Sequence, residues 1–245
     1  MKKIAVITSK GGAGKTTTAV NLGHGLALKG KKVLLVDCDS QGSIGTSFKT
    51  NANGSLSDLF LHGRGTLTQV RPNLFILPSG GIRLAEAERV ISNKVGREFI
   101  LKNAMAGLLN VDYVLCDCSP SVNLININAL SFSDVFILPV SMDFLAFEGA
   151  KQTLRLVKEV RNFANTELEL LGILPTQYDS RTRVSRRILE LLRITFQKHM
   201  FRTVIRVNTK FREAPNFGKS IFEYAPNSTA TEDYRSLTEE VMSIL

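Results

Sequence analysis

A short segment near the start of the chain combines lysine, glycine and threonine in a pattern that suits phosphate binding. Its members are Lys10, Gly11, Gly12, Ala13, Gly14, Lys15, Thr16 and Thr17. Glycine lacks the Cβ that would stop the backbone from folding round an anion. The segment follows the P-loop pattern G-x-x-x-x-G-K-[ST], except that Ser9 replaces the first glycine. In that pattern the lysine, here Lys15, binds phosphate oxygens, and the hydroxyl, here of Thr16, binds Mg²⁺.

The residues on either side of this segment indicate the elements that must position it. Residues 4–7 are apolar and mostly β-branched, which is typical of a buried strand. After Lys15 the apolar residues recur at helical spacing, as at Leu22 and Leu26. The N-terminus of this helix would direct free N–H groups into the turn. The context favours a phosphate site over a glycine-rich turn that binds nothing.

Aspartates stand at the ends of two other apolar runs. Asp37 and Asp39 follow residues 33–36, and Asp117 ends the run that begins at residue 111. Ligands bind at the carboxyl ends of strands in open α/β sheets, so we expect these carboxylates near the phosphate turn. There they can hold Mg²⁺ or orient an attacking water. The alternative for Asp37 and Asp39 is an acidic turn whose side chains cap loop N–H groups.

The order of strands and helices predicts an α/β fold, with a doubly wound, mostly parallel sheet covered by helices on both faces. We expect a single domain over residues 1–245. The polar residues 42–72 predict a loop with a short helix at 56–61. Further strands are predicted at 73–78, 111–117, 135–140 and 169–179, and helices at 82–109, 146–160 and 229–244.

Composition and charge are those of a soluble globular protein with an anionic partner. Hydrophobic residues make up 44% of the chain and charged residues 22%. The net charge of +9 favours nucleic acid or an anionic membrane as partner. No stretch has the length of a transmembrane helix, and no signal-like apolar core precedes the first strand.

The three cysteines, Cys38, Cys116 and Cys118, lie at the ends of apolar runs. We interpret them as buried thiols in a reducing cytosol. The alternative is a metal or iron–sulfur site. We disfavour it on the expectation that Cys116 and Cys118 point to opposite faces of one strand.

Residues 181–219 carry the positive charge of the chain. This segment holds eleven basic and two acidic residues, a net charge of +9 that equals the charge of the whole chain. Such concentration is an electrostatic footprint for nucleic acid. The alternative is a solvated face of arginines that pair with acids. The segment contains only two acids, which are too few to neutralise eleven basic residues by local pairing. Contacts to phosphates would make binding salt dependent and independent of sequence. Aromatic residues are too sparse there for a single-strand stacking platform.

Several of these strings resemble the ParA/MinD family of ATPases. KGGAGKTT resembles the family's deviant Walker A motif, and DCDSQG resembles its D-x-D-x-Q element. DCSPS is similar to D-x-P-P-S with Ser119 in place of the first proline, which predicts a less rigid switch loop because proline fixes φ. The stretches DSRT and VNTKFREAPNFGKSI resemble the short, Soj-like partition proteins of this family. The resemblance covers nearly the whole chain.

The resemblance implies an ATPase that binds ATP and Mg²⁺, converts ATP and water to ADP and phosphate, and is slow without its partner. Lys10 would cross to the nucleotide of a second subunit in an ATP-bound homodimer. Asp39 would position the hydrolytic water, while Asp37 and Asp117 would support Mg²⁺. Asn208 matches an asparagine near the adenine base.

The resemblance also implies non-specific binding of double-stranded DNA by the ATP-bound dimer. Arg181 and Lys210 match DNA-binding positions of the family, and Arg206 and Arg212 stand close enough to add contacts. A ParB-like partner would stimulate hydrolysis and release the DNA. The expected location is the cytoplasm, on the nucleoid.

Two alternatives belong to the same family. One is a MinD-like, membrane-associated regulator of division. We disfavour it because the chain ends in the short acidic string SLTEEVMSIL rather than in a basic amphipathic helix, so no membrane contact is expected. The other is an ATPase that positions a different cargo. The sequence does not distinguish a chromosome, a plasmid or another cargo.

Overall fold

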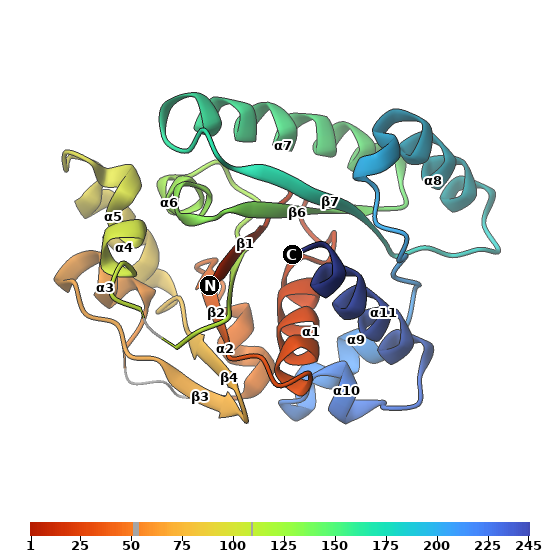
Figure 1. Cartoon of the computed structure of the whole chain (residues 1–245), viewed down its shortest axis with the longest axis horizontal. Helices are drawn as coiled ribbons and strands as arrows, with labels where there is room; N and C mark the ends of the chain where they lie inside the picture. Colours follow the sequence, from red (N-terminus) through yellow and green to blue (C-terminus); the bar gives the residue numbers. More distant parts are fainter. Residues whose placement is uncertain (51–53, 109) are drawn as a thin grey trace.

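A seven-stranded sheet forms the centre of the computed structural model, which describes residues 1–50, 54–108 and 110–245 (Figure 1). The strand order is β3-β4-β2-β5-β1-β6-β7. Neighbouring strands are parallel except β3 and β4, which are antiparallel. The strands are β1 (Lys2–Val6), β2 (Val33–Cys38), β3 (Thr68–Arg71), β4 (Leu74–Leu77), β5 (Tyr113–Cys118), β6 (Val135–Ser141) and β7 (Glu169–Thr176).

Helices cover both faces of this sheet, as predicted. In Figure 1, α6 and α7 lie on one side of β6 and β7, and α1 and α11 lie on the other. The α-helices of the described residues are α1 (Lys15–Leu28), α2 (Ser43–Phe48), α3 (Leu56–His62), α4 (Ile82–Ile91), α5 (Ile100–Ala104), α6 (Leu124–Phe132), α7 (Phe144–Phe163), α8 (Arg183–Phe196), α9 (Lys210–Glu213), α10 (Ile221–Tyr224) and α11 (Thr229–Ile244). Short 3₁₀ helices span Arg97–Phe99, Gln197–His199 and Ala214–Phe217.

The strands read as continuous apolar runs because both of their faces are buried. Leu34 and Val36 of β2 belong to the hydrophobic cluster under α3 to α8, whereas Val33 and Leu35 belong to the cluster under α1, α2 and α11. This alternation is the period of two that a strand requires. Full burial of one such side chain stabilises the fold by about 1.5–3 kcal/mol. The helices are therefore fixed against the sheet, and the loops at its carboxyl edge are held in place.

Two elements of the region 42–72 were not predicted. The helix α2 and the edge strand β3 both lie in the part interpreted as loop, while the predicted helix at 56–61 is confirmed as α3. The region 82–109 is not one helix, because a 3₁₀ turn separates α4 from α5. Residues 51–53 of the predicted loop and residue 109 of the predicted helical region lie outside the described residues.

The cysteines are buried as predicted, but one expectation about them was wrong. Cys116 and Cys118 point to the same face of β5, because residues two apart in a strand share a face. Both belong to one buried cluster with Cys38, which lies opposite Cys118 in the register of β2 and β5. All three thiols are free and buried, and burial contributes to raising the pKa of Cys118 well above its ordinary value. The described residues contain no group of three His, Cys, Asp or Glu side chains able to hold a metal ion.

Across residues 1–50, 54–108 and 110–245, none of the helices combines the length and the apolar character that spanning a bilayer requires.

Candidate active site

A cavity of about 590 Å³ opens at the carboxyl edge of the sheet. The lysine–glycine–threonine segment lines one side of it, and residues 205–212 line the other. Asp39, directly after β2, and Thr176, the last residue of β7, also line it. Its volume is in the range of pockets that hold small molecules and cofactors. The cavity therefore lies where ligands bind in open α/β sheets.

The glycine turn presents backbone N–H groups to this cavity. Gly12 and Gly14 have φ values of 74° and 89°, in the left-handed region that glycine adopts without strain. Gly14 is the N-cap of α1 and supplies no side-chain cap, and the first turn of α1 contains no acidic residue. The unpaired N–H groups and the positive end of the helix dipole are thus available to an anion.

Strand β7 holds the turn from the other side of the cavity. The Thr176 hydroxyl donates a hydrogen bond of 2.9 Å to the Ala13 carbonyl, and the Gln177 side-chain amide donates to the Gly12 carbonyl. Gln177 has a φ of 54°, an uncommon backbone conformation for a residue with a side chain. These bonds fix the carbonyls of the turn. The sequence did not reveal this role, because Thr176 and Gln177 lie more than 160 residues from their partners.

Lys15 lies at the bottom of the turn with 7% of its surface exposed. Its Nζ donates to the Lys10 carbonyl at 3.2 Å. Burial lowers the pKa of Lys15, and the nearby Asp117 carboxylate offsets part of this effect. A buried ammonium with one carbonyl partner has donors left for phosphate oxygens.

Asp37 and Asp117 face each other across neighbouring strands and are fully buried. Both oxygens of Asp37 accept backbone N–H groups, from Ile44 at 2.9 Å and from Asp39 at 3.2 Å. Even so, burial raises the pKa of Asp37 to about 7. Asp37 thus caps the loop before α2, as the acidic-turn alternative for this residue proposed.

Asp117 differs, because neither of its oxygens has a hydrogen-bond partner among the described residues. Burial and the nearby Asp37 raise the pKa of Asp117 well above its ordinary value, and Thr16 and Lys15 lie close enough to offset part of this rise. A buried carboxylate without a partner is costly unless a cation or a proton meets it. The pair of Asp117 and Thr16 therefore fits Mg²⁺, whose remaining ligands would be waters and phosphate oxygens.

Asp39 reaches the cavity itself. One of its oxygens, Oδ1, accepts the Gln41 N–H at 2.9 Å, which fixes the carboxylate without burying it fully. A partly solvated carboxylate at the cavity wall can accept a proton from, or orient, a water molecule there.

Lys10 does not line its own cavity in the part of the chain that the structure describes. Its Nζ instead pairs with Asp143, the N-cap residue of α7. Burial would raise the pKa of Asp143, but hydrogen bonds from Lys10, from the Ser141 hydroxyl and from the Ala146 N–H together lower it. Asp143 was not predicted, since 133 residues separate it from Lys10.

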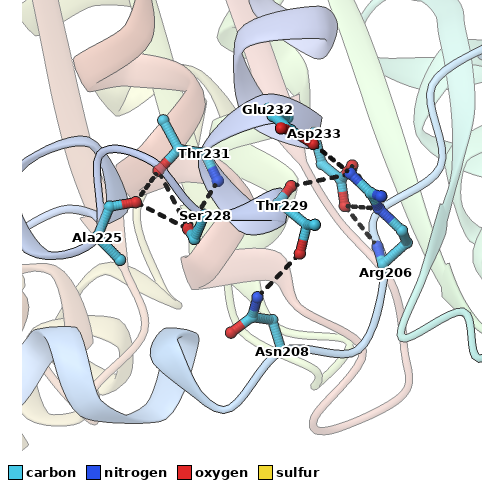
Figure 2. A network of polar contacts seen from close by, with 8 residues as sticks. All are labelled: Arg206, Asn208, Ala225, Ser228, Thr229, Thr231, Glu232 and Asp233. Atoms are coloured by element: carbon cyan, nitrogen blue, oxygen red, sulfur yellow. Dashed lines mark hydrogen bonds and ion pairs between the residues drawn. The ribbon is translucent and has the colours of Figure 1, made fainter.

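Asn208 lies on the cavity wall opposite the glycine turn. Figure 2 shows its amide donating to the Thr229 hydroxyl at 3.1 Å, at the start of α11. Its Oδ1 accepts the Lys210 N–H at 3.0 Å. This side chain is therefore held in place on the cavity wall by its contacts with Thr229 and Lys210.

The predicted DNA-binding residues are mostly engaged within the chain. Arg206 donates from Nε and Nη2 to Asp233, with distances of 2.6–3.2 Å, and pairs also with Glu232 (Figure 2). Arg181 forms a two-pronged contact with Asp179 at 2.8 and 2.9 Å. Lys210 pairs with Glu213 at 2.8 Å. The expectation that too few acids were at hand was wrong for these residues, because acids outside 181–219 also supply partners.

Arg212 is exposed and lines the cavity, and it has no ion pair among the described residues. Of the four predicted DNA-binding residues, Arg212 is therefore the one whose charge is free to contact an anion.

The loop after Asp117 is fixed by hydrogen bonds from a buried asparagine. The Asn126 side chain accepts the Ser119 N–H at 3.1 Å and donates to the carbonyls of Ser119 and Ser121 at 2.9 and 2.6 Å. A proline at position 119 could not supply that N–H. The serine therefore replaces a rigid residue by a hydrogen-bonded one.

The sheet order and the glycine turn define a P-loop ATPase of the doubly wound type. A family model described as "AAA domain" matches residues 1–170. The chain is 38% identical to the sporulation initiation inhibitor protein Soj of Bacillus subtilis, over 98% of both chains. It is 34% identical to the chromosome partitioning protein ParA of Myxococcus xanthus, over 98% of this chain and 87% of that one.

A solved structure agrees with the fold. Cobyrinic acid a,c-diamide synthase from Mycobacterium smegmatis, with bound ATP analogue and magnesium, superimposes with a TM-score of 0.82 at 30% identity. The match covers 98% of this chain and 93% of that one. On the full-length identity to Soj and ParA, the chain belongs to the ParA/Soj family of ATPases.

Proposed function

We propose that this chain is a partition ATPase of the Soj type, which binds DNA as an ATP-bound dimer and releases it on hydrolysis. The observation that carries the proposal is that Lys15 and Thr16 line a cavity of nucleotide size and lie close to the buried Asp117, which has no hydrogen-bond partner among the described residues. The full-length similarity to proteins named for chromosome partitioning supports the biological role.

Each residue of the site has a distinct task. Lys15 and the N–H groups of the glycine turn hold the β- and γ-phosphates of ATP, and Asn208 lies beside the adenine base. Thr16 and Asp117, supported by Asp37, would hold Mg²⁺, which supplies positive charge at the phosphate oxygens when bound. Asp39 orients the attacking water.

Lys10 acts in the partner subunit's site. Its pairing with Asp143 keeps the amine outside its own cavity. A partly exposed ion pair of this kind contributes about 1 kcal/mol, so phosphates of a second subunit can replace Asp143 as the partner of Lys10 at a small free-energy cost. ATP in both sites would thus close a homodimer through two exchanged lysines.

The dimer binds double-stranded DNA without sequence preference. Two basic surfaces on one rigid dimer bind with an affinity far above that of one surface, because the second contact is intramolecular. A ParB-like partner stimulates the slow hydrolysis, the dimer opens, and the DNA dissociates. The protein would accordingly be found on the nucleoid in the cytoplasm.

The test combines two readouts on the wild type and the Asp39→Ala variant. We expect the wild type to release phosphate from ATP slowly and to bind an arbitrary duplex with ATP but not with ADP. Asp39→Ala should lose hydrolysis and keep the DNA-bound state. Rapid turnover by that variant would remove the role given to Asp39. Sedimentation with anionic liposomes instead of DNA would favour the MinD-like alternative.

A further inference from the structure

Ion pairs within the chain change which cations of residues 181–219 are free to contact phosphates, compared with the prediction from the sequence. Arg206 is committed to Asp233, whose side chain is only 8% exposed, and Arg181 and Lys210 each contact an acid. Moving such a side chain onto a phosphate would first break its internal pair, at a larger free-energy cost for Arg206, whose partner is buried, than for the exposed pairs of Arg181 and Lys210. Cations without such pairs are better candidates for phosphate contacts.

All four arginines of α8 are exposed and form no ion pair with a described residue. Arg187 lines an apolar groove, and the other three, Arg183, Arg186 and Arg193, lie along one side of the helix. At 3.6 residues per turn and 1.5 Å per residue, they fall within about 80° of the helix circumference and extend over about 15 Å. We call this set the α8 arginine row. The single acid on that side of the helix is Glu190, which is exposed as well.

The rest of α8 has other tasks. Ile188, Leu189 and Leu192 are buried against the core. Beside the arginine row, Val184, Ile194 and Phe144 of α7 line a mostly apolar groove, to which Arg187 and Glu190 also contribute. An apolar groove does not suit phosphates, so a duplex would contact the helix on the side of the arginine row.

The start of α8 is connected to the nucleotide site. Gln177, which holds the glycine turn, precedes Arg183 by only six residues, and Asp179 and Thr182 fix the turn between them through hydrogen bonds to Ser185. A surface at the start of α8 therefore has a short and hydrogen-bonded path to the phosphates of the nucleotide.

We propose that the α8 arginine row is the main phosphate-contact surface for duplex DNA, an inference that rests on the proposed function. Guanidinium groups bind phosphates in a two-pronged manner that lysines do not match. The row of about 15 Å spans about four phosphates of one strand, at 3.4 Å of helix axis per charge.

The experiment measures binding of the full chain with ATP to a fluorescent duplex of arbitrary sequence, at several salt concentrations. The test variant carries three substitutions, Arg183→Ala, Arg186→Ala and Arg193→Ala. A control with the same loss of charge replaces exposed arginines of α4, α7 and α11, namely Arg89→Ala, Arg155→Ala and Arg235→Ala. Thermal unfolding checks that both variants fold.

We expect the test variant to lose at least tenfold in affinity and its salt dependence to fall by about 2 to 3 in log–log slope per bound subunit. The control should bind nearly as the wild type does. Glu190→Gln removes the one acid beside the row and should tighten binding, a gain that misfolding cannot produce.

Equal losses in the test and control variants would show that only net charge matters and would overturn the assignment to α8. Unchanged binding by the test variant would also overturn it, and would leave the proposed function intact. Absence of duplex binding by the wild type with ATP would remove both.

Discussion

The pKa values of Asp37 and Asp117 are both raised in the protein without ligands. Two carboxylates face each other on adjacent buried strands, and one of them has no hydrogen-bond partner among the described residues. A buried carboxyl group beside another carboxyl group favours its protonated, neutral form until a cation binds next to it. At the residue scale, the proposed binding of Mg²⁺ would therefore be coupled to loss of a proton.

The first prediction concerns the pH dependence of stability without nucleotide or metal. The carboxyl of Asp37 titrates near 3.9 when unfolded and near 7 when folded. Its contribution to stability is full below pH 4 and is lost between about pH 4 and 7, because over that range the unfolded chain has released a proton that the folded chain still holds. Above pH 7 both states have lost the proton and this contribution changes no further.

Thermal unfolding between pH 5 and 8 should thus show a falling midpoint in the wild type and a flatter profile in Asp37→Asn. Parallel profiles would show that Asp37 is not the group that titrates.

Strand β7 illustrates the element scale, since its end positions the glycine turn that belongs to β1 and α1. Thr176 donates to the Ala13 carbonyl from a buried position. Thr176→Val keeps the shape and removes the donor. Loss of one neutral hydrogen bond costs about 1 kcal/mol, so we expect about fivefold weaker ADP binding by calorimetry. Unchanged affinity would mean that the turn holds its shape without β7.

The loop after β5 gives a second prediction at this scale. Asn126→Ala leaves the Ser119 N–H and two carbonyls without their partner. Ser121 is exposed, so its carbonyl can bind water instead, but Ser119 is buried. Each buried polar group left unsatisfied costs about 1–3 kcal/mol, and we expect a loss of that order in denaturant unfolding. The exposed Asn103→Ala in α5 serves as control and should change stability by less than about 0.5 kcal/mol. Equal effects would assign no special role to Asn126.

Local patterns explain which elements the sequence predicts. The last helix was predicted at 229–244 and is observed as Thr229–Ile244, since its apolar stripe and its Ser228 cap are both local. Helix α2 carries a weak local signal, and part of its support comes from Asp37, whose carboxylate accepts the Ile44 N–H. The edge strand β3 is polar and pairs with β4 alone.

The site divides in the same way. The glycine turn and the strand-end aspartates were predictable because each is read within a few residues. The pairs Lys10–Asp143 and Arg206–Asp233 were not, because folding brings together residues that the sequence keeps 133 and 27 positions apart. Charge counting within one segment therefore overstated the number of free cations at its C-terminal end.

At the scale of the whole molecule, an ion pair and hydrogen bonds connect the candidate site, Lys10 and the start of α8. Lys10 pairs with the cap of α7, and the turn that contains it is held by Gln177 just before α8. In the proposed cycle, a change of partner for Lys10 would thus affect both the dimer and the DNA-binding surface. ATP would shift the equilibrium from monomer to dimer only by the difference between its binding free energies for these two states.

Duplex binding by the wild type and by Lys10→Ala, each with ADP and with ATP, tests this central claim most directly. We predict that ATP promotes binding by the wild type and that Lys10→Ala stays at the ADP level, while ATP affinity of the monomer is unchanged. Wild-type binding that ignores the nucleotide, or full ATP-dependent binding by Lys10→Ala, would contradict the claim that an exchanged lysine couples ATP to DNA.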